Sequence, residues 1–146
     1  MKILVIGESC TDRFVYGHVQ DRKCPEAPAF ILSPSSTSEN AGMAANTQAN
    51  VKSLGVHCDI ITNLEQIIKE RLVDVNSNYL LLRVDHNENS VNRIDRTNIS
   101  PEKLSEYEAI IISDYNKGFL AEQDIQFISE HHELVFMDTK KLLGDW

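Results

Sequence analysis

The segment from Ala109 to Leu120, Ala-Ile-Ile-Ile-Ser-Asp-Tyr-Asn-Lys-Gly-Phe-Leu, constrains the fold of this chain more than any other. Its apolar start contains three consecutive isoleucines, which is typical of a strand buried on both faces of a parallel sheet. Polar side chains follow directly, at the carboxyl edge where open α/β sheets bind their ligands. This turn offers a hydroxyl, a carboxylate, an amide and an ammonium group, from Ser113, Asp114, Asn116 and Lys117. It is therefore a candidate ligand site, and an ordinary strand-to-helix turn is the alternative.

Two further apolar runs end in polar residues in the same way. They lie at Ile3 to Ile6 and at Leu134 to Met137, and the polar residues after them include Glu8, Asp12, Asp138 and Lys140. We expect both runs to be buried strands, and parallel strands share one carboxyl edge. Asp12 is then a candidate for binding a ligand hydroxyl. A solvated carboxylate or a local cap is the alternative.

The region after the first strand combines extended and helical patterns. Phe14 to Leu32 mixes aromatic, β-branched and proline residues, which predicts short extended pieces outside the main sheet. Ser33 to Asn40 is small and polar, which predicts a loop. Gly42 to Leu54 predicts a helix that ends at Gly55. Small residues at the start of this helix suit either a ligand or close packing on the sheet.

A ribbon of two strands is predicted in the middle of the chain. His57 to Thr62 has the pattern of a strand, and Glu70 to Val75 with Leu80 to Val84 has the pattern of a hairpin. The ribbon carries or adjoins three basic residues, Lys69, Arg71 and Arg83. These side chains either bind a phosphate or are simply solvated, as most exposed charges are.

The last segments without an assignment are a loop and two helices. Asn87 to Asn98 is polar and is predicted to be a mobile loop. Ser100, Pro101 and Glu102 provide an N-cap, a proline at the first helical position and an acid in the first turn, which predicts a short helix. Ala121 to His131 has the apolar spacing of an amphipathic helix.

Composition narrows the class of protein. A chain of 146 residues is one domain by length, and a formal charge of −8 disfavours nucleic acid as a partner. Three widely spaced cysteines without a Cys-x-x-Cys pair argue against a zinc site and predict a reducing compartment, the cytoplasm. The sequence shows neither a signal peptide nor an apolar run of membrane-spanning length, so no membrane association is expected.

In this order the segments resemble the PfkB (ribokinase-like) sugar kinases, and within them the heptose 7-phosphate kinase portion of the bifunctional ADP-heptose synthesis proteins. The likeness covers nearly the whole chain and rests on the order and spacing of short motifs: Gly7-Glu8, Asp12-Arg13, Tyr16-Gly17, Pro25 to Pro28, Gly42 to Asn46, Arg71, Leu82 to Asp85, Ser113 to Gly118 and Asp138 to Lys140. The resemblance implies the N-terminal half of a ribokinase-like fold. That half is a Rossmann-like α/β domain, with a mainly parallel sheet flanked by helices and a small β lid near residues 13–32 and 69–85. Residues 1–146 then form one sugar-binding half-domain.

The resemblance also implies roles for individual residues. In such kinases the aspartate after the first strand and the glycine-rich helix start with its asparagine bind the sugar, and basic lid residues suit the substrate phosphate. The sugar roles fall to Asp12, Gly42 and Asn46, and the phosphate roles to Lys69, Arg71 and Arg83. The floor between sugar and nucleotide would be lined by Asp114, Lys117, Asp138 and Lys140. No residue is assigned as catalytic or as a metal ligand.

The sequence departs from the kinase pattern at three places. The usual paired glycine is Gly42-Met43, and a helix-bearing unit common in ribokinases is missing between Thr62 and Lys69. The sequence also lacks the second-half motifs, the Asn-x-x-Glu magnesium segment and the Gly-Ala-Gly-Asp anion hole with its catalytic base. We therefore expect the nucleotide-binding half to be absent, and no cofactor in the isolated chain, with ATP and Mg²⁺ only where a missing half completes it.

These observations predict a sugar-phosphate kinase module that needs a nucleotide half from elsewhere. Its expected partners are a small-molecule sugar phosphate and either a second copy of the chain in a homo-oligomer or a partner chain that supplies the nucleotide half. The alternative is a non-catalytic sugar-phosphate binding or assembly protein derived from such a kinase.

Overall fold

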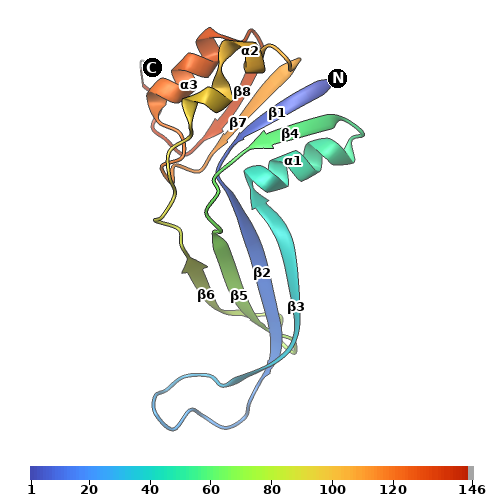
Figure 1. Cartoon of the computed structure of the whole chain (residues 1–146). Coiled ribbons are helices and arrows are strands. Elements are labelled where there is room, and N and C mark those ends of the chain that lie inside the picture. The colour runs from blue at the N-terminus through green and yellow to red at the C-terminus, as the bar shows by residue number, and fades with distance from the viewer. Residues whose placement is uncertain (145–146) are drawn as a thin grey trace.

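The computed structural model describes residues 1–144, which form two four-stranded sheets with helices on one of them. The elements in chain order are β1 (Lys2–Gly7), β2 (Ser9–Val19), β3 (Leu32–Met43), α1 (Ala44–Ser53), β4 (His57–Ile61), β5 (Ile68–Asp74), β6 (Leu80–His86), the 3-10 helix η1 (Arg96–Ile99), α2 (Pro101–Leu104), β7 (Ala109–Asp114), α3 (Glu122–Glu130) and β8 (Val135–Thr139). Figure 1 shows the helices gathered around the first sheet, while the second sheet extends away from it.

The first sheet is parallel throughout and has the strand order β4-β1-β7-β8. The apolar runs of β1 and β7 lie side by side at its centre, with Val5 opposite Ile111. Continuous apolar strands favour this position because both of their faces are covered. The prediction of an α/β fold with a mainly parallel, helix-flanked sheet is confirmed.

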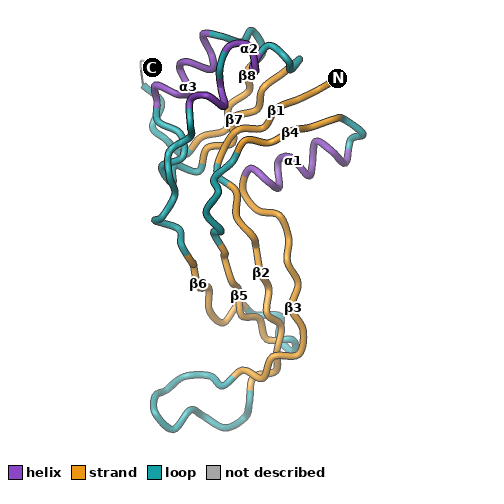
Figure 2. Tube along the Cα trace, in the orientation of Figure 1, coloured by secondary structure: helices purple, strands orange, loops and turns teal. Residues whose placement is uncertain are grey.

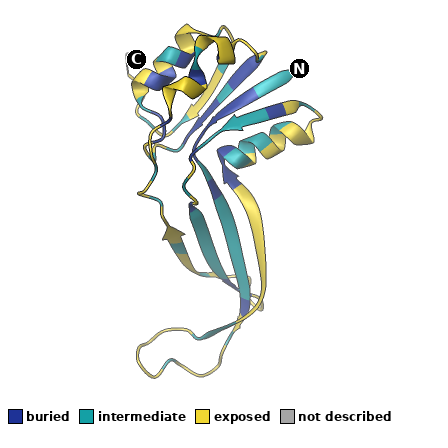
Figure 3. Cartoon of the chain, in the orientation of Figure 1, coloured by how far each residue is buried: buried dark blue, intermediate teal, exposed yellow. Residues whose placement is uncertain are grey.

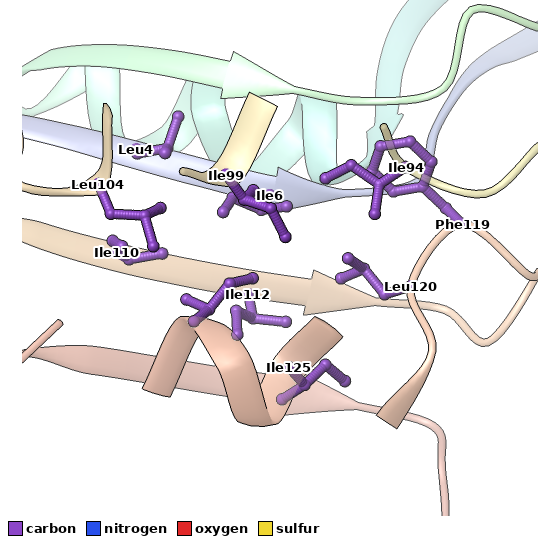
Figure 4. Packing of buried hydrophobic residues seen from close by; sticks show 11 residues of the cluster. Leu4, Ile6, Ile94, Ile99, Leu104, Ile110, Ile112, Phe119, Leu120 and Ile125 are labelled. Carbon is purple, nitrogen blue, oxygen red and sulfur yellow. The ribbon is translucent and has the colours of Figure 1, made fainter. Parts of the chain in front are cut away.

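One face of the parallel sheet carries the main hydrophobic core. Figure 4 shows Ile110 and Ile112 of β7 packed between side chains from β1 and from the helical segments. Ile125 of α3 and Leu104 of α2 cover this face, as their amphipathic patterns require. The opposite face is covered over β1 and β4 by α1, where Val5, Ala44 and Cys58 form a smaller cluster.

The second sheet is mixed and has the order β3-β2-β5-β6. β2 pairs antiparallel with β3 and parallel with β5, and β5 pairs antiparallel with β6. Figure 2 shows these long strands leaving the parallel sheet, and Figure 3 shows that much of β3 is exposed.

Two sequence predictions about this sheet were wrong. Ser33 to Asn40 is part of β3 rather than a loop, and Phe14 to Val19 continues one long strand. Polar residues form β3 because the neighbouring β2 supplies its hydrogen bonds, and such long-range pairing overrides local propensity.

β8 differs from the prediction of a buried strand. Phe136 is 56% exposed and Met137 is 42% exposed. β8 is the last strand of the parallel sheet and pairs only with β7 among the described strands. Phe136 lies opposite Ile111, on the face where the helix α1 covers β1 and β4 instead.

The loop before β7 is better anchored than its polar composition suggests. Ile94 and Ile99 are buried in the main core. Arg93 and Arg96 each donate to the buried carboxylate of Asp124, at 2.8 and 3.0 Å. The predicted cap at Ser100 is confirmed, since its side chain accepts a hydrogen bond from the Lys103 amide.

Within residues 1–144, none of the helices is long and apolar enough to cross a membrane.

Candidate functional site

The site lies where the two sheets meet, and glycine permits the junction. Gly7 ends β1 beside Ser113 of β7, and a side chain at Gly7 would overlap the Ser113 carbonyl oxygen. This close approach brings the start of β2, which carries Asp12, next to the turn that follows β7.

Glu8 organises that turn. Its side chain is fully buried, and its carboxylate accepts hydrogen bonds from the backbone amides of Tyr115, Lys117 and Phe119, at 2.9, 2.9 and 3.2 Å. Sequence reasoning placed Glu8 in an edge turn but assigned it no role. An acid directly after a buried strand is the signal that could have identified it, because a carboxylate there needs donors to remain buried.

Asp114, which was predicted to bind substrate, is buried and is bonded to the protein's own donors. It is 1% exposed, and its carboxylate accepts from Thr139 Oγ1 at 2.6 Å and from Lys141 Nζ at 2.8 Å. It also accepts from the Asn116 amide. These bonds occupy the carboxylate with the protein's own donors, so Asp114 joins the ends of β7 and β8 and positions the turn.

Asp12 lies on β2 beside Arg71 of β5. Arg71 Nη1 donates to Asp12 Oδ1 at 2.6 Å, and the guanidinium lies 5.1 Å from the centre of the Phe14 ring. Gly42 faces Asp12 from β3, and a Cβ at Gly42 would lie 2.5 Å from both Asp12 Oδ2 and Cys10 Sγ. The missing side chain therefore lets the Asp12 carboxylate and the Cys10 thiol pack directly against the backbone of β3.

Cys10 and Met43 form the apolar floor beside this carboxylate. Both side chains are buried and pack with Ile67. Burial raises the pKa of the Cys10 thiol, and the negative charge of Asp12 raises it further. Met43 stands at the start of α1 with φ 58° and ψ −131°, a backbone conformation that favours glycine. The departure Gly42-Met43 thus places a side chain where the backbone would accept none without strain.

The lysines of the site meet at Glu88, a residue that sequence reasoning did not single out. Glu88 Oε1 lies 2.8 Å from Lys117 Nζ and 3.7 Å from Lys69 Nζ. Tyr115 stands beside them, with Lys69 Nζ at 5.8 Å and Lys140 Nζ at 4.7 Å from its ring centre. One strand of the second sheet and the segments that follow two strands of the parallel sheet therefore contribute cations to one cluster.

The other predicted residues lie around this cluster. Arg83 is the direct neighbour of Arg71 across β5 and β6, and it donates two hydrogen bonds to Asp85, at 2.7 and 2.8 Å. The hydrogen bond from Arg83 lowers the pKa of Asp85. Asn46 is exposed in the first turn of α1, and Asp138 is exposed near the end of β8.

A cleft of about 520 Å³ opens at the same junction. Its lining includes Cys10, Asn40 and Ala45, together with the short connection from Asn63 to Ile67. Asn63 holds this connection to β2, because its amide oxygen accepts from the Ser9 amide at 2.7 Å. The tight connection expected between Thr62 and Lys69 is therefore part of the cleft wall.

The fold matches solved carbohydrate kinases. Phosphofructokinase-2 from Escherichia coli superposes with a TM-score of 0.62 at 12% identity, over 96% of this chain and 54% of that chain. Ribokinase from Cryptococcus neoformans superposes with a TM-score of 0.53 at 15% identity, over 98% and 50%. The fold is that of a ribokinase-like carbohydrate kinase, and this chain covers about half of it.

The relatives by sequence are bifunctional proteins named HldE. The protein from Helicobacter pylori strain HPAG1 is 29% identical, and that from Helicobacter acinonychis is 32% identical, each over 95% of this chain. The chain spans 37% of the length of both relatives. No family model matches it. The resemblance to PfkB-type sugar kinases and HldE proteins is thus confirmed for part of their length.

Proposed function

We propose that this chain is the sugar-binding portion of a sugar-phosphate kinase, which holds a substrate such as a heptose 7-phosphate for ATP-dependent phosphoryl transfer. The observation that carries the proposal is the position of Asp12 beside a cluster of basic side chains from both sheets, Lys69, Arg71 and Lys117. Carboxylates accept hydrogen bonds from sugar hydroxyls, and cationic groups donate to phosphate. Similarity to HldE proteins and the kinase fold support the same assignment.

Asp12 is the proposed hydroxyl acceptor. Arg71 holds its Oδ1, and Oδ2 packs against Gly42, where an added Cβ would lie 2.5 Å away. Among the described residues Oδ2 accepts no hydrogen bond, so a sugar hydroxyl would donate to it without displacing Arg71. Asn46, exposed on the first turn of α1, is proposed to complete the sugar pocket.

The basic residues are proposed to hold the phosphate of the substrate. Lys69, Arg83 and Lys117 would neutralise its charge. Asp138 and Lys140, at the end of β8, are proposed to face the nucleotide. Phosphoryl transfer depends mainly on such positioning and charge stabilisation. In this proposal the second sheet acts as the lid over the sugar, with segments near residues 13–32 and 69–85. Residues 1–146 together form a single half-domain.

ATP and Mg²⁺ are not assigned to residues of this chain. Among residues 1–144, no three His, Cys, Asp or Glu side chains converge as a metal ion requires. The described residues therefore do not fit a metal site of their own, and we derive no step through either group. We propose that a nucleotide-binding half on a partner chain supplies them. A homo-oligomer of this chain is the alternative assembly. The three free cysteines suit a reducing compartment.

A non-catalytic sugar-phosphate binding protein is the second candidate. The Gly42-Met43 departure is the observation that favours it, because it places a side chain where the kinase pattern has a second glycine. The gene beyond codon 146 separates the two candidates. A frame that encodes Gly-Ala-Gly-Asp supports the kinase, and its absence supports the binding protein.

Calorimetric titration with sedoheptulose 7-phosphate tests the proposed site. We expect millimolar or tighter binding that is stronger than for sedoheptulose or inorganic phosphate and that weakens with salt. Asp12→Asn should weaken it about 10- to 100-fold, the equivalent of one hydrogen bond to a charged group. Lys103→Ala, on the exposed side of α2, should leave it unchanged. Absence of binding, or an Asp12→Asn variant with native affinity, contradicts the proposal.

A further inference from the structure

We infer, building on the proposed function, that the phosphate subsite is the space between Lys69 and Lys117, and that Glu88 fills this space as a built-in competing anion. Glu88 would then set the affinity for phosphorylated ligands. A sugar phosphate must displace the Glu88 carboxylate, whereas an unphosphorylated sugar leaves it in place.

The Glu88 carboxylate contacts two lysines with one oxygen, as a phosphate oxygen would. A single oxygen, Oε1, faces both ammonium groups, at 2.8 Å from Lys117 and 3.7 Å from Lys69. The two lysines come from different sheets, since Lys69 lies on β5 and Lys117 follows β7. The Lys69 side chain is only 12% exposed. Two converging ammonium groups in a partly buried place form a site for an oxyanion, and an anion fills it here.

The backbone that carries Glu88 is held at both ends. Asn87 Nδ2 donates to the Gln66 carbonyl at 3.0 Å. Asn92 donates from its backbone amide to Glu65 Oε1 at 3.1 Å, and its side-chain amide bonds the same oxygen. Both anchors lie on the short connection before β5. The position of Glu88 is therefore built into the loop, and the carboxylate can leave the lysines by rotation of its own side chain.

Two other cations of the site, Arg71 and Arg83, have partners on strands and not on a loop. Arg71 is held by Asp12 and Arg83 by Asp85, and both carboxylates stand on strands that pair with their neighbours. Asp12 is also the residue proposed to bind the sugar. Lys69 and Lys117 are therefore the two cations that share a carboxylate from a loop.

Glu88→Gln tests the inference, with sedoheptulose 7-phosphate, sedoheptulose and inorganic phosphate as calorimetric probes. The glutamine keeps the shape of the side chain and removes its charge. We expect the affinity for sedoheptulose 7-phosphate and for phosphate to rise about 3- to 10-fold, because a paired anion no longer competes. The affinity for sedoheptulose should stay the same.

Glu70→Gln is the matched control. Glu70 is 23% exposed against 22% for Glu88, lies on β5 next to Lys69 in the chain, and contacts Arg13. Successive side chains of a strand point to opposite faces, so Glu70 faces away from the site. This variant changes the net charge equally and should alter phosphate affinity less than twofold. Lys69→Gln in the Glu88→Gln background should abolish the gain.

The results separate this inference from the proposed function. If native protein binds sedoheptulose 7-phosphate through Asp12 and Glu88→Gln leaves that affinity unchanged or lower, the inference is wrong and the proposed function stands. An equal gain in Glu70→Gln also overturns it, since net charge alone would then explain the effect. If neither the native protein nor Glu88→Gln binds at millimolar concentration while both melt cooperatively, the inference and the proposed function are both wrong.

Discussion

Replacement of Glu8 by glutamine perturbs the junction of the two sheets at one atom. Oε2 of Glu8 accepts from the Tyr115 amide, and Oε1 accepts from the amides of Lys117 and Phe119. In Glu8→Gln, the amide oxygen can still serve two of these donors. The amide nitrogen must then face the third donor, which loses its acceptor.

The expected loss of stability is about 2–4 kcal/mol. A hydrogen bond to a charged group contributes about 1.5–3 kcal/mol and a neutral one about 0.5–1.5 kcal/mol, so one bond is lost and two are weakened. Burial of a charge is costly, and removing it offsets part of the loss. A single domain has about 5–15 kcal/mol of stability, so the variant should still fold.

Urea denaturation followed by far-UV circular dichroism measures this effect. Glu133→Gln, at an exposed position before β8, is the control and should unfold like the native protein. Because Glu8 also holds the Lys117 amide, Glu8→Gln should weaken binding of sedoheptulose 7-phosphate. A free energy of unfolding within about 0.5 kcal/mol of the Glu133→Gln value would refute the reasoning, since surface substitutions have effects of that size.

Gly42→Ala should weaken sugar-phosphate binding in calorimetry, because the added Cβ would lie 2.5 Å from Asp12 Oδ2 and would displace that carboxylate. A thermal melt should show that the variant still folds, and unchanged binding would contradict the prediction. Burial would raise the pKa of Asp124, but hydrogen bonds from two arginines and a backbone amide outweigh it and lower that pKa. The stability that the Asp124 carboxylate contributes is therefore present at neutral pH and lost as pH falls below about 4. In Asp124→Asn, the free energy of unfolding from urea titrations should fall less steeply at acid pH. Light scattering should show that the chain associates at tens of micromolar through the exposed edge of β8, and Phe136→Glu should reduce this association. Leu64→Glu, at a fully exposed position outside β8, should not reduce it, and a monomeric native chain would contradict the prediction.

Local patterns in the sequence determined several elements without help from the fold. The apolar runs of β1 and β7, the cap at Ser100 and the end of α1 at Gly55 follow from residues within a few positions of one another. Gly55 has φ 77°, as a helix-ending glycine requires. The order of the short motifs was also sufficient to identify the kinase fold.

The tertiary structure alone decided how these pieces combine. Ser33 to Asn40 became a strand because β2 lies beside it, and Phe136 of β8 stayed exposed because α1 covers β1 and β4 instead. Glu8 and Glu88 acquired their roles from donors that lie far away in the sequence. The sequence by itself therefore determined the strands of the parallel sheet, the helices and the class of fold, since these depend on local periodicity and motif order. Only the tertiary structure decided which charges meet, because ion pairs and buried hydrogen bonds join residues that no local pattern connects.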